Sequence, residues 1–403
     1  MRLKNAHLVM LVAAVAVAAV AIGGGLAYRQ GPQADRNAAS PLAAPSTTAP
    51  STPASTPVAK TSTPVTKPPS STPTKTPTAP PTLTPRDPAF TGPVKVNFKL
   101  SKLPRGRAPQ VPYLVGREVR GPGLPITIPG SDDVWEVSRL GHQVLAIISN
   151  AEGTELLKVS YSGAPVRTPD VTSIVSTDDG TAVAYATSRR GSVSKGVQGG
   201  AVYAQTDADT QVHKLLLPKA WDLRVLAYTN GQVYFRSSDS DGATNWRLYT
   251  WTPGSSEATL IKTVSSPTGL TVDGRIAASI NIRGDLSTCT NLTEVATGKR
   301  LWRTCENQVV SFTPDGTIAV GVPASQNGWG DFKASALDVK TGNLLREWTG
   351  PAFHRTVAED DQHFLILADD GVDTKAAIVR CTVTTGACEL AVPPTTGQVL
   401  LGS

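Results

Sequence analysis

Few residues of this 403-residue chain have the types and spacing that catalysis requires. The tetrapeptide SVSK at Ser192 places a serine three residues before a lysine, but that pairing acts from a helix N-terminus and lies here in the glycine-rich loop RRGSVSKGVQGG. The stretch SDSDGATNW, with Asp239 and Asp241, lacks the bidentate glutamate of a calcium loop. His354 and His363 are interpreted as hydrogen-bonded structural residues. We therefore predict no catalytic residue, no metal site and no cofactor.

Four cysteines allow three disulfide pairings. Cys289 and Cys305 lie eight residues on either side of Thr297, while Cys381 and Cys388 flank a similar Thr-Gly turn. Opposite positions on paired strands bring Cβ atoms within about 4.5–5.5 Å, which is close enough for a disulfide. The spacing predicts the pairs 289–305 and 381–388. Metal binding is the alternative, but the chain has no CxxC motif and its histidines lie elsewhere.

The cysteines belong to a phrase that recurs every 44 residues. Its glycines are Gly254 in LYTWTPGS, Gly298 in EVATGK, Gly342 in DVKTGN and Gly386 in TVTTGA. In each case β-prone residues stand on both sides of a polar turn, where glycine supplies a positive φ. One further step of 44 residues reaches Thr210 in the similar stretch AQTDADTQVHKLLL. The recurrence predicts one repeated structural unit.

A second phrase alternates with the first one. It reads SIVSTDDGTAVAYA, VLAYTNGQVYF, GLTVDGRIAAS and SFTPDGTIAVGV, and Asp-Gly or Asn-Gly between apolar runs indicates a hairpin. Two hairpins per period give four strands every ~40–50 residues, which is the period of a β-propeller blade. Such a sheet buries both faces only by stacking on its neighbours. The expected fold is an all-β propeller of seven four-stranded blades, with six or eight still open.

Complete units are expected to begin near six positions, namely Val134, Val171, Val225, Pro267, Val309 and Thr356. The segment YLVGREVRGPGLPITIPG reads as a hairpin and the tail GQVLLGS as one strand. Together these two ends of the domain would complete the last blade, which closes the ring and removes exposed strand edges.

Two families share these phrases. FTPDG resembles the turn of TolB-like, WD-repeat-like bacterial propellers, and EVATGKRLW resembles the A-x-D-x-x-T-G-K-x-x-W docking motif of pyrroloquinoline-quinone-type (PQQ-like) propellers. In ALDVKTGNLLREW the tryptophan, Trp348, falls two places late. The resemblance covers about residues 111–403 and implies that the docking motif packs neighbouring blades without taking part in chemistry.

In an up-and-down blade the first and third turns lie on one face of the ring. Those turns are short here, so the long polar second loops on the opposite face are the predicted contact surface. An exposed tryptophan among these loops is expected to act as a contact anchor; the alternative is solvated loops with the tryptophan folded back onto a blade. The candidate ligand-binding residues are Arg189, Arg190, Asp239, Asp241, Trp246, Arg283, Asp285, Trp329, Asp331, Asp370 and Asp373.

The N-terminal quarter of the chain is expected to carry a targeting signal and a linker. Residues 1–7 form a basic flank, and residues 8–28 are an apolar run without charge that is long enough for a transmembrane helix. A cleaved signal peptide is the alternative. Residues 29–95 form a Pro/Thr/Ser-rich linker that has too few apolar residues to fold and would extend as a stalk. Residues 96–403 form the propeller domain, which either interpretation places outside the cytoplasm, tethered to the membrane or secreted. This layout resembles that of actinobacterial envelope proteins.

The charge distribution argues against nucleic acid as a partner. The net charge is +6, but residues 1–110 carry +11, which leaves −5 for the remaining 293 residues. A nucleic-acid-binding protein concentrates basic charge on its folded domain. The hypothesis is a non-enzymatic binding or scaffold domain for a protein or a cell-envelope glycan. The alternatives are an enzyme (a polysaccharide hydrolase or lyase, or a quinone-type dehydrogenase) and an accessory sensor subunit.

Overall fold

The computed structural model describes residues 90–150, 153–190, 196–209, 211–241, 245–283, 287–325, 331–371 and 375–402. The chain divides into two units, Met1–Thr82 and Leu83–Ser403, and all described residues belong to the second. The predicted basic flank, the apolar segment 8–28 and most of the predicted linker lie outside the described residues. Within the described ranges no helix has the length and apolar character of a membrane span.

In the described part of the chain, five antiparallel sheets have four strands each. The strands are β28 with β2, β3 and β4 (Val399–Leu401, Tyr113–Val115, Glu118–Arg120, Ile126–Thr127); β5 to β8 (Asp133–Leu140, Gln143–Asn150, Gly153–Val159, Val166–Pro169); β9 to β12 (Val171–Ser176, Ala182–Arg190, Gly196–Thr206, His213–Leu217); β13 to β16 (Trp221–Thr229, Gln232–Ser238, Arg247–Trp251, Thr259–Ser265); and β17 to β20 (Pro267–Leu270, Ile276–Arg283, Ser287–Glu294, Arg300–Thr304).

A sixth sheet has eight strands, because two four-stranded halves share β24 and the short strand β1 adds to it. Its strands are β21 (Asn307–Phe312), β22 (Ile318–Pro323), β23 (Asp331–Asp338), β24 (Leu344–Ala358), β25 (His363–Asp369), β26 (Ala376–Thr382), β27 (Cys388–Thr395) and β1 (Lys95–Asn97), which lies parallel to β24. The first part of β24 pairs mainly with β23, and the second part pairs with β25. The chain therefore passes from one four-stranded half to the next without a turn.

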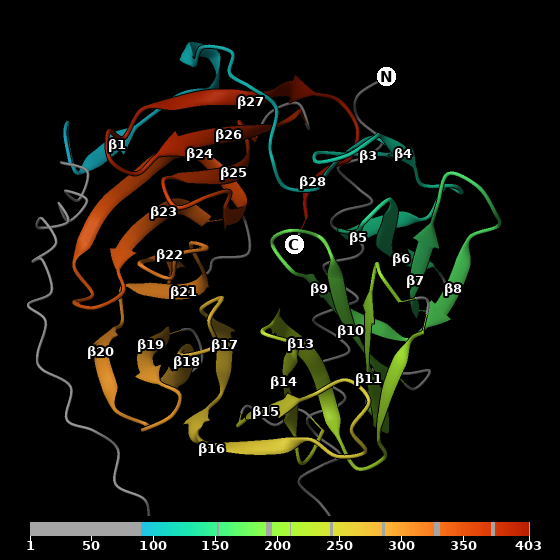
Figure 1. Cartoon of the computed structure of the whole chain (residues 1–403). Helices are drawn as coiled ribbons and strands as arrows, with labels where there is room; N and C mark the ends of the chain where they lie inside the picture. The colour runs from blue at the N-terminus through green and yellow to red at the C-terminus, as the bar shows by residue number, and fades with distance from the viewer. Residues whose placement is uncertain are drawn as a thin grey trace, which may run out of the picture. The chain divides into compact units, whose positions relative to one another are not determined.

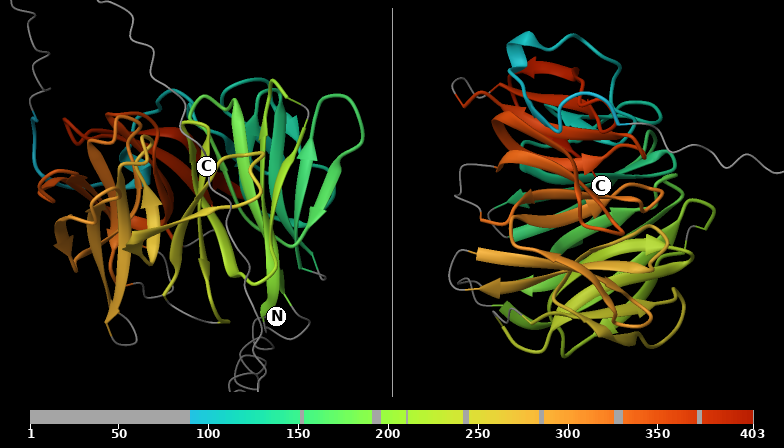
Figure 2. Two further views of the ribbon diagram at one scale, coloured as in Figure 1. Left: turned by 60° about the horizontal axis from the view of Figure 1, so that its bottom comes forward. Right: turned by 90° about the vertical axis from the view of Figure 1, so that its left-hand side faces the viewer.

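The innermost strands contact one another in a closed series. In order they are β28, β5, β9, β13, β17, β21 and the second part of β24, and β25 then contacts β28 again. The sheets stand side by side around a central axis, which is the arrangement of a β-propeller (Figures 1 and 2). The C-terminal strand β28 pairs with β2, with Tyr113 opposite Leu401. Strands from both ends of the described region thus share one sheet, as the sequence predicts.

The apolar core lies between neighbouring sheets. Strand β6 shows why, because five consecutive residues in its sequence QVLAIISN are buried and no polar face is left. A strand buried on both faces reads as a continuous apolar run rather than an alternating one. One buried cluster combines Val202 of β11 with Leu223 of β13 and Phe235 of β14, and so joins two sheets. Stacking of these units, rather than each sheet alone, supplies the burial that stabilises the fold.

The 44-residue repeat corresponds to contacts between neighbouring sheets. Three equivalent carbonyl oxygens, of Val295, Val339 and Val383, each accept a hydrogen bond from the preceding four-stranded unit, which for Val383 is the first half of the sixth sheet. The donors are Thr263 Oγ1 at 2.5 Å, Trp302 Nε1 at 2.8 Å and Arg346 Nε at 2.9 Å. Arg346 stands 44 residues after Trp302 and so takes the place of the docking tryptophan.

Glycine is needed in these turns for two reasons. Gly342 has φ +76°, and a Cβ atom there would lie 2.8 Å from Cδ2 of Trp302. Gly386 has φ +79°, and a Cβ atom there would lie 2.8 Å from a methyl carbon of Val96. A side chain would therefore meet both an unfavourable backbone conformation and a close neighbour, which is Trp302 at Gly342 and Val96 of β1 at Gly386.

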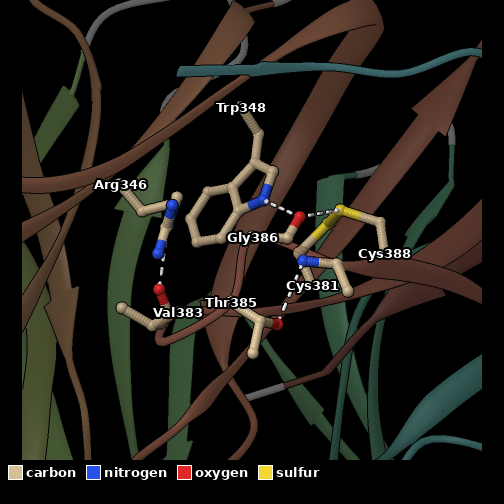
Figure 3. The surroundings of a disulfide bond; sticks show 8 residues. Arg346, Trp348, Cys381, Val383, Thr385, Gly386 and Cys388 are labelled. Carbon is tan, nitrogen blue, oxygen red and sulfur yellow. Dashed lines mark hydrogen bonds between the residues drawn. A yellow bond between two sulfur atoms is a disulfide. The ribbon is translucent and has the colours of Figure 1, made fainter. Parts of the chain in front are cut away.

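The cysteines form two disulfides, Cys289–Cys305 and Cys381–Cys388, each with a Cα–Cα distance of 4.1 Å. These are the two pairs that the spacing predicts. Figure 3 shows that Trp348 lies beside the second disulfide, where its Nε1 donates to the carbonyl oxygen of Gly386 at 3.2 Å. The late position of Trp348 in the repeat thus gives a second donor to the same turn.

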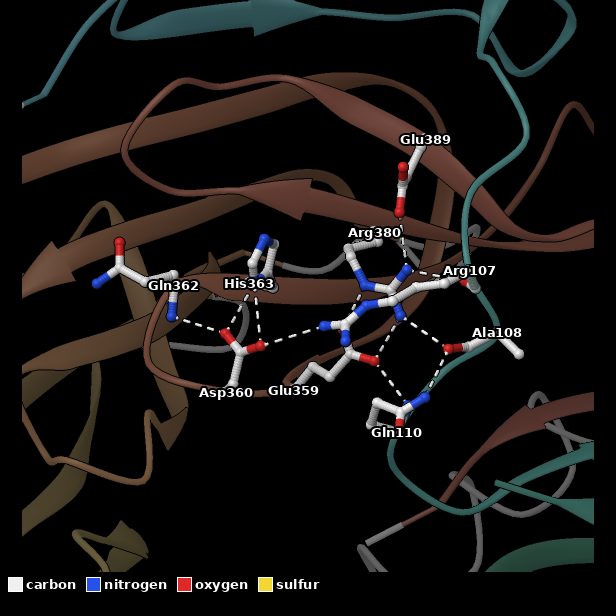
Figure 4. Close-up of polar contacts among 9 residues, drawn as sticks. All are labelled: Arg107, Ala108, Gln110, Glu359, Asp360, Gln362, His363, Arg380 and Glu389. Carbon is white, nitrogen blue, oxygen red and sulfur yellow. Dashed lines mark hydrogen bonds and ion pairs between the residues drawn. The ribbon is translucent and has the colours of Figure 1, made fainter. Parts of the chain in front are cut away.

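Residues 90–110, which precede the ring, pack along the outer part of the sixth sheet. Strand β1 adds to β24, and the ring of Phe98 stacks on Phe353 with centroids 5.7 Å apart. Farther along, the buried guanidinium of Arg380 binds Glu359 and Glu389 and donates to the carbonyl oxygens of residues 107 and 108 (Figure 4). Pairing and covering the strand edges in this way protects them from association with other chains.

Candidate functional site

A cavity of about 1000 Å³ lies along the axis of the ring, lined by residues of the inner strands β5, β9, β13, β17, β21 and β24. We call the face at which these strands begin the long-loop face, because the second loop of each sheet lies there too. The opposite face, with the short Asp-Gly and Thr-Gly turns, is called the turn face. The predicted contact residues belong to the long-loop face.

Near the long-loop face, β5, β9, β17, β21 and β24 each carry one extra residue opposite their neighbour, and β13 carries one between Trp221 and Arg224. A β-bulge of this kind re-aims a side chain and is common next to functional sites. The five residues, together with Arg224 at the corresponding place in β13, are called the rim positions. They are Trp135, Thr172, Thr268, Val310 and His354.

Two rim positions have a structural role. The Oγ1 atom of Thr172 donates to the carbonyl oxygen of Leu223 at 2.7 Å, and Thr268 Oγ1 donates to that of Val309 at 3.1 Å. Each bond joins an inner strand to the inner strand of the next sheet. A threonine at the rim therefore satisfies a backbone acceptor and locks two sheets together.

In β13 another residue makes this structural contact. The corresponding carbonyl oxygen of the next sheet belongs to Pro267, and it accepts a hydrogen bond from Arg236 Nη1 of β14 at 3.2 Å. Arg224 at the rim is thereby free of the bond that Thr172 and Thr268 make, and its side chain lines the axial cavity. Arg224 and Arg236 stand directly opposite each other on β13 and β14.

A tryptophan supports this arginine pair. The guanidinium of Arg236 lies 4.0 Å from the ring centroid of Trp246, which is a cation–π contact. Trp246 Nε1 donates to Asp222 Oδ2 at 2.6 Å, and Asp222 Oδ1 lies 3.7 Å from Arg224 Nε. Burial, followed by the nearby charge of Arg224, lowers the pKa of Arg236 to about 10. Two cations thus share one carboxylate.

On the sixth sheet, His354 lies among carboxylates rather than among cations. Its Nε2 forms a hydrogen bond with Asp369 Oδ2, and the residue lines both the axial cavity and a smaller cavity of about 510 Å³. Phe332 and Asp370 also line the smaller cavity. Burial raises the pKa of the Asp331 carboxyl, and the nearby His354 acts in the opposite direction. These groups have the types that proton transfer requires.

The remaining rim features are an ion pair and an exposed aromatic side chain. Arg355 Nη2 lies 3.3 Å from Glu136 Oε1, and both residues line the axial cavity. Trp135, next to Glu136, is 65% exposed at the bulge of β5. Large exposed aromatic side chains are typical contact residues.

The structure describes the side chains of five predicted candidates. Asp331 lines the axial cavity and Asp370 the smaller one, while Trp246 contacts Arg236. Asp239 pairs with Arg247 at 2.5 Å, and Asp241 is exposed. Six candidates lie outside the described residues or have side chains that the structure does not describe, namely Arg189, Arg190, Arg283, Asp285, Trp329 and Asp373.

Sequence reasoning missed the rim. Trp135, Arg224 and Arg236 lie within strands, where a polar or aromatic residue is expected to face solvent, and His354 was interpreted as structural. A signal was present in the repeat, because the equivalent triplets VTS and PTG carry a threonine where LRV carries Arg224. Where one repeat replaces the structural threonine by another residue, as at Arg224, that position is a candidate for function.

No protein-family model and no curated protein match the sequence. Among solved structures, an uncharacterized protein lmo1340 from Listeria monocytogenes superposes with a TM-score of 0.47 at 10% identity, over 70% of this chain and 91% of that one. TolB from Acinetobacter baumannii gives 0.39 at 14% identity, over 62% and 69%. An oligogalacturonate lyase in complex with manganese gives 0.45 at 15%, over 64% and 79%. All three TM-scores are below 0.5, so the fold assignment depends on the strand pairing described above.

The described residues limit what the site can do. They include no group of three or more His, Cys, Asp or Glu side chains that would hold a metal ion. The rim instead offers an aromatic side chain, an arginine pair on a tryptophan and a histidine between two carboxylates. Groups of these types can contact a ligand through stacking, charge and hydrogen bonds.

Proposed function

We propose that this chain is an extracytoplasmic binding or scaffold protein, in which a propeller of seven blades is carried on a Pro/Thr/Ser-rich stalk. Five four-stranded sheets and the two halves of the eight-stranded sheet supply the seven blades. Residues 8–28 would anchor the chain in the membrane, or be cleaved as a signal peptide. Two disulfides suit an oxidising compartment outside the cytoplasm.

The ligand would be a protein or an envelope glycan that binds at the long-loop face. One observation carries this proposal. Rim positions occupied by threonine hold the sheets together, whereas Trp135, Arg224 and His354 make no such contact in the part of the chain that the structure describes. Arg224 and His354 line the axial cavity, and Trp135 is exposed next to Glu136, which also lines it. A rigid scaffold that varies at one face is the usual arrangement of a binding domain.

The test is partner capture from intact cells that produce the full chain. Chemical cross-linking and purification should yield a partner with the wild-type protein, and the combined variant Trp135→Ala, Trp246→Ala and His354→Ala should lose it. Arg275→Ala on the turn face is the matched control, because its side chain is exposed and contacts only Asp273 among the described residues. Retention of every partner by the rim variant would contradict the assignment of this face.

Fractionation of the same cells tests the localisation. Immunoblots should place the chain in the membrane fraction, with the propeller accessible to protease added outside the cell. A chain found in the culture medium would favour the cleaved signal peptide over the anchor. A chain protected within intact cells would contradict both.

An enzyme is the second candidate, favoured by Asp331 and His354 at the cavity. The Asp331 carboxyl has a raised pKa and lies near His354, which is hydrogen-bonded to Asp369; such a pair could donate and accept protons in acid–base catalysis. The substrate class would be a polysaccharide that is hydrolysed or cleaved by elimination. A panel of envelope polysaccharides incubated with wild type and His354→Ala tests this, because only histidine-dependent release of shorter products supports it.

A further inference from the structure

We infer that Arg224 and Arg236 form an oxyanion-binding site, which takes a carboxylate or a phosphate group of the ligand at the mouth of the axial cavity. This inference rests on the proposed binding function and specifies the chemistry of the ligand. It concerns the sheet of β13 to β16, away from the histidine cluster of the sixth sheet.

The first argument is electrostatic. Like charges directly opposite each other on paired strands destabilise a sheet, yet Arg224 stands opposite Arg236. Asp222 is the carboxylate beside them, and one of its oxygens already accepts from Trp246 at 2.6 Å while the other lies 3.7 Å from Arg224. The cluster keeps an excess of one positive charge, which a bound anion would neutralise.

The second argument concerns hydrogen-bond donors. Arg236 donates through Nη1 to the carbonyl oxygen of Pro267, whereas its Nε is shielded from solvent and has no acceptor among the described residues. A guanidinium carries five donors in a planar fork that matches carboxylate and phosphate oxygens. The side chain of Arg224 is 45% exposed, and both arginines line the cavity.

The third argument concerns preorganisation. Trp246 holds one face of the Arg236 guanidinium at 4.0 Å, and Asp222 fixes the indole in turn. Asp222 has φ +45°, but Asp170 and Ser266 at the starts of neighbouring inner strands also have positive φ. The backbone conformation is therefore a property of the fold, and the Trp246–Arg236 stack is what distinguishes this sheet. A guanidinium held in one orientation loses little entropy when it binds an anion.

The test is isothermal titration of the purified full chain at constant ionic strength. The probes are sodium glucuronate and sodium phosphate, and glucose is the neutral analogue of the first. We expect one saturable site for at least one anion and no heat of binding for glucose. Tighter glucuronate binding would assign a carboxylate ligand and tighter phosphate binding a phosphate ligand.

Variants locate the site. Arg224→Gln and Arg236→Gln should each weaken anion binding at least tenfold, Arg236→Lys should weaken it less because the charge remains, and Arg275→Gln on the turn face should leave it unchanged. Circular dichroism checks that each variant is folded. Equal binding of glucose, no saturable anion binding, or unchanged affinity in both glutamine variants would overturn the inference.

Failure of this inference is distinguishable from failure of the proposed function. Partner capture is measured separately with the same two glutamine variants. If capture requires Trp135 and His354 but tolerates both arginine changes, the face binds a partner and the oxyanion site is wrong. If no rim variant affects capture, the proposed function itself is wrong.

Discussion

The three equivalent carbonyl oxygens of Val295, Val339 and Val383 allow a graded test of how neighbouring sheets are held together. Their donors differ in kind, since one is a hydroxyl, one is an indole and one is a guanidinium. We expect Thr263→Val, Trp302→Phe and Arg346→Met to lower the free energy of unfolding in that increasing order. Each change removes the donor and keeps most of the apolar volume.

The expected losses in free energy of unfolding follow from the hydrogen bonds that each variant removes. Thr263 is exposed and loses one neutral hydrogen bond, which costs about 0.5 kcal/mol. Trp302 loses one bond in a partly buried site, for about 1 kcal/mol.

Arg346 is 1% exposed and donates to the carbonyl oxygens of Val383, Thr384, Thr91 and Pro93. Four charged bonds of at least about 1.5 kcal/mol each are worth roughly 6 kcal/mol. Methionine has no charge to desolvate, so the variant regains the several kcal/mol that burial of the guanidinium costs. About 3 kcal/mol of destabilisation remains.

Equilibrium unfolding in urea, followed by circular dichroism and tryptophan fluorescence, measures the series. With a slope of about 3 kcal/mol/M, Arg346→Met should lower the midpoint by roughly 1 M, and Trp302→Phe by roughly 0.3 M. An Arg346→Met midpoint as high as that of Trp302→Phe would refute the reasoning, because the extra bonds of the guanidinium would then contribute nothing to stability.

Three further predictions concern stability. Replacing both cysteines of one pair by serine should lower the free energy of unfolding by about 3 kcal/mol for Cys289–Cys305 and about 2.5 kcal/mol for Cys381–Cys388, from the lengths of the closed loops. Urea unfolding measures the loss, and double variants as stable as the wild type would contradict the prediction. Glu359→Gln should cost about 3–5 kcal/mol, because it removes a charge from a pair whose side chains are 0% and 3% exposed; the exposed pair variant Glu118→Gln is the control and should lose under about 1 kcal/mol. The Thr177 hydroxyl, followed by donors of Thr181, lowers the pKa of Asp179 in the folded state, so its stabilisation is present above the unfolded value of about 3.9 and disappears as the pH falls through the folded pKa. Thermal unfolding of wild type and Asp179→Ala should therefore differ at pH 7 and converge in acid, and a difference independent of pH would exclude the carboxylate as its source.

Much of the fold follows from the sequence because the repeat records contacts. The Thr-Gly phrase predicts blades, and the structure shows that the glycine also accommodates the docking residue of the preceding sheet, as Gly342 does for Trp302. The continuous strand β24 was not predicted. No turn signal separates its halves, and nothing local in the sequence specifies that Gly350-Pro351 continues as a strand. The short strand β1, Lys-Val-Asn, likewise has no apolar run to identify it.

The candidate site was less accessible from the sequence. Loops could be assigned to the long-loop face by counting turns, and Asp331, Asp370 and Trp246 do lie at or beside the cavities or the arginine pair. Whether a residue within a strand faces the axis depends on bulges, and a shift of one residue reverses the direction of the side chain. Arg224 and Trp135 therefore could not be told from ordinary solvent-facing residues.

Thr172 and Arg236 make corresponding bonds to the next sheet from different strands, and this difference indicates how such a scaffold acquires a binding site. In three of the described sheets a side chain donates to one carbonyl oxygen of the next sheet, and in two of them a rim threonine is the donor. In the third, Arg236 reaches that carbonyl from the second strand, so the rim position no longer has to be a donor to the backbone. An arginine there costs no contact between sheets and adds a second cation to the cavity. Arg236→Gln should then affect two properties at once, stability through the bond to Pro267 and anion affinity through its charge, whereas Arg224→Gln should affect the affinity alone.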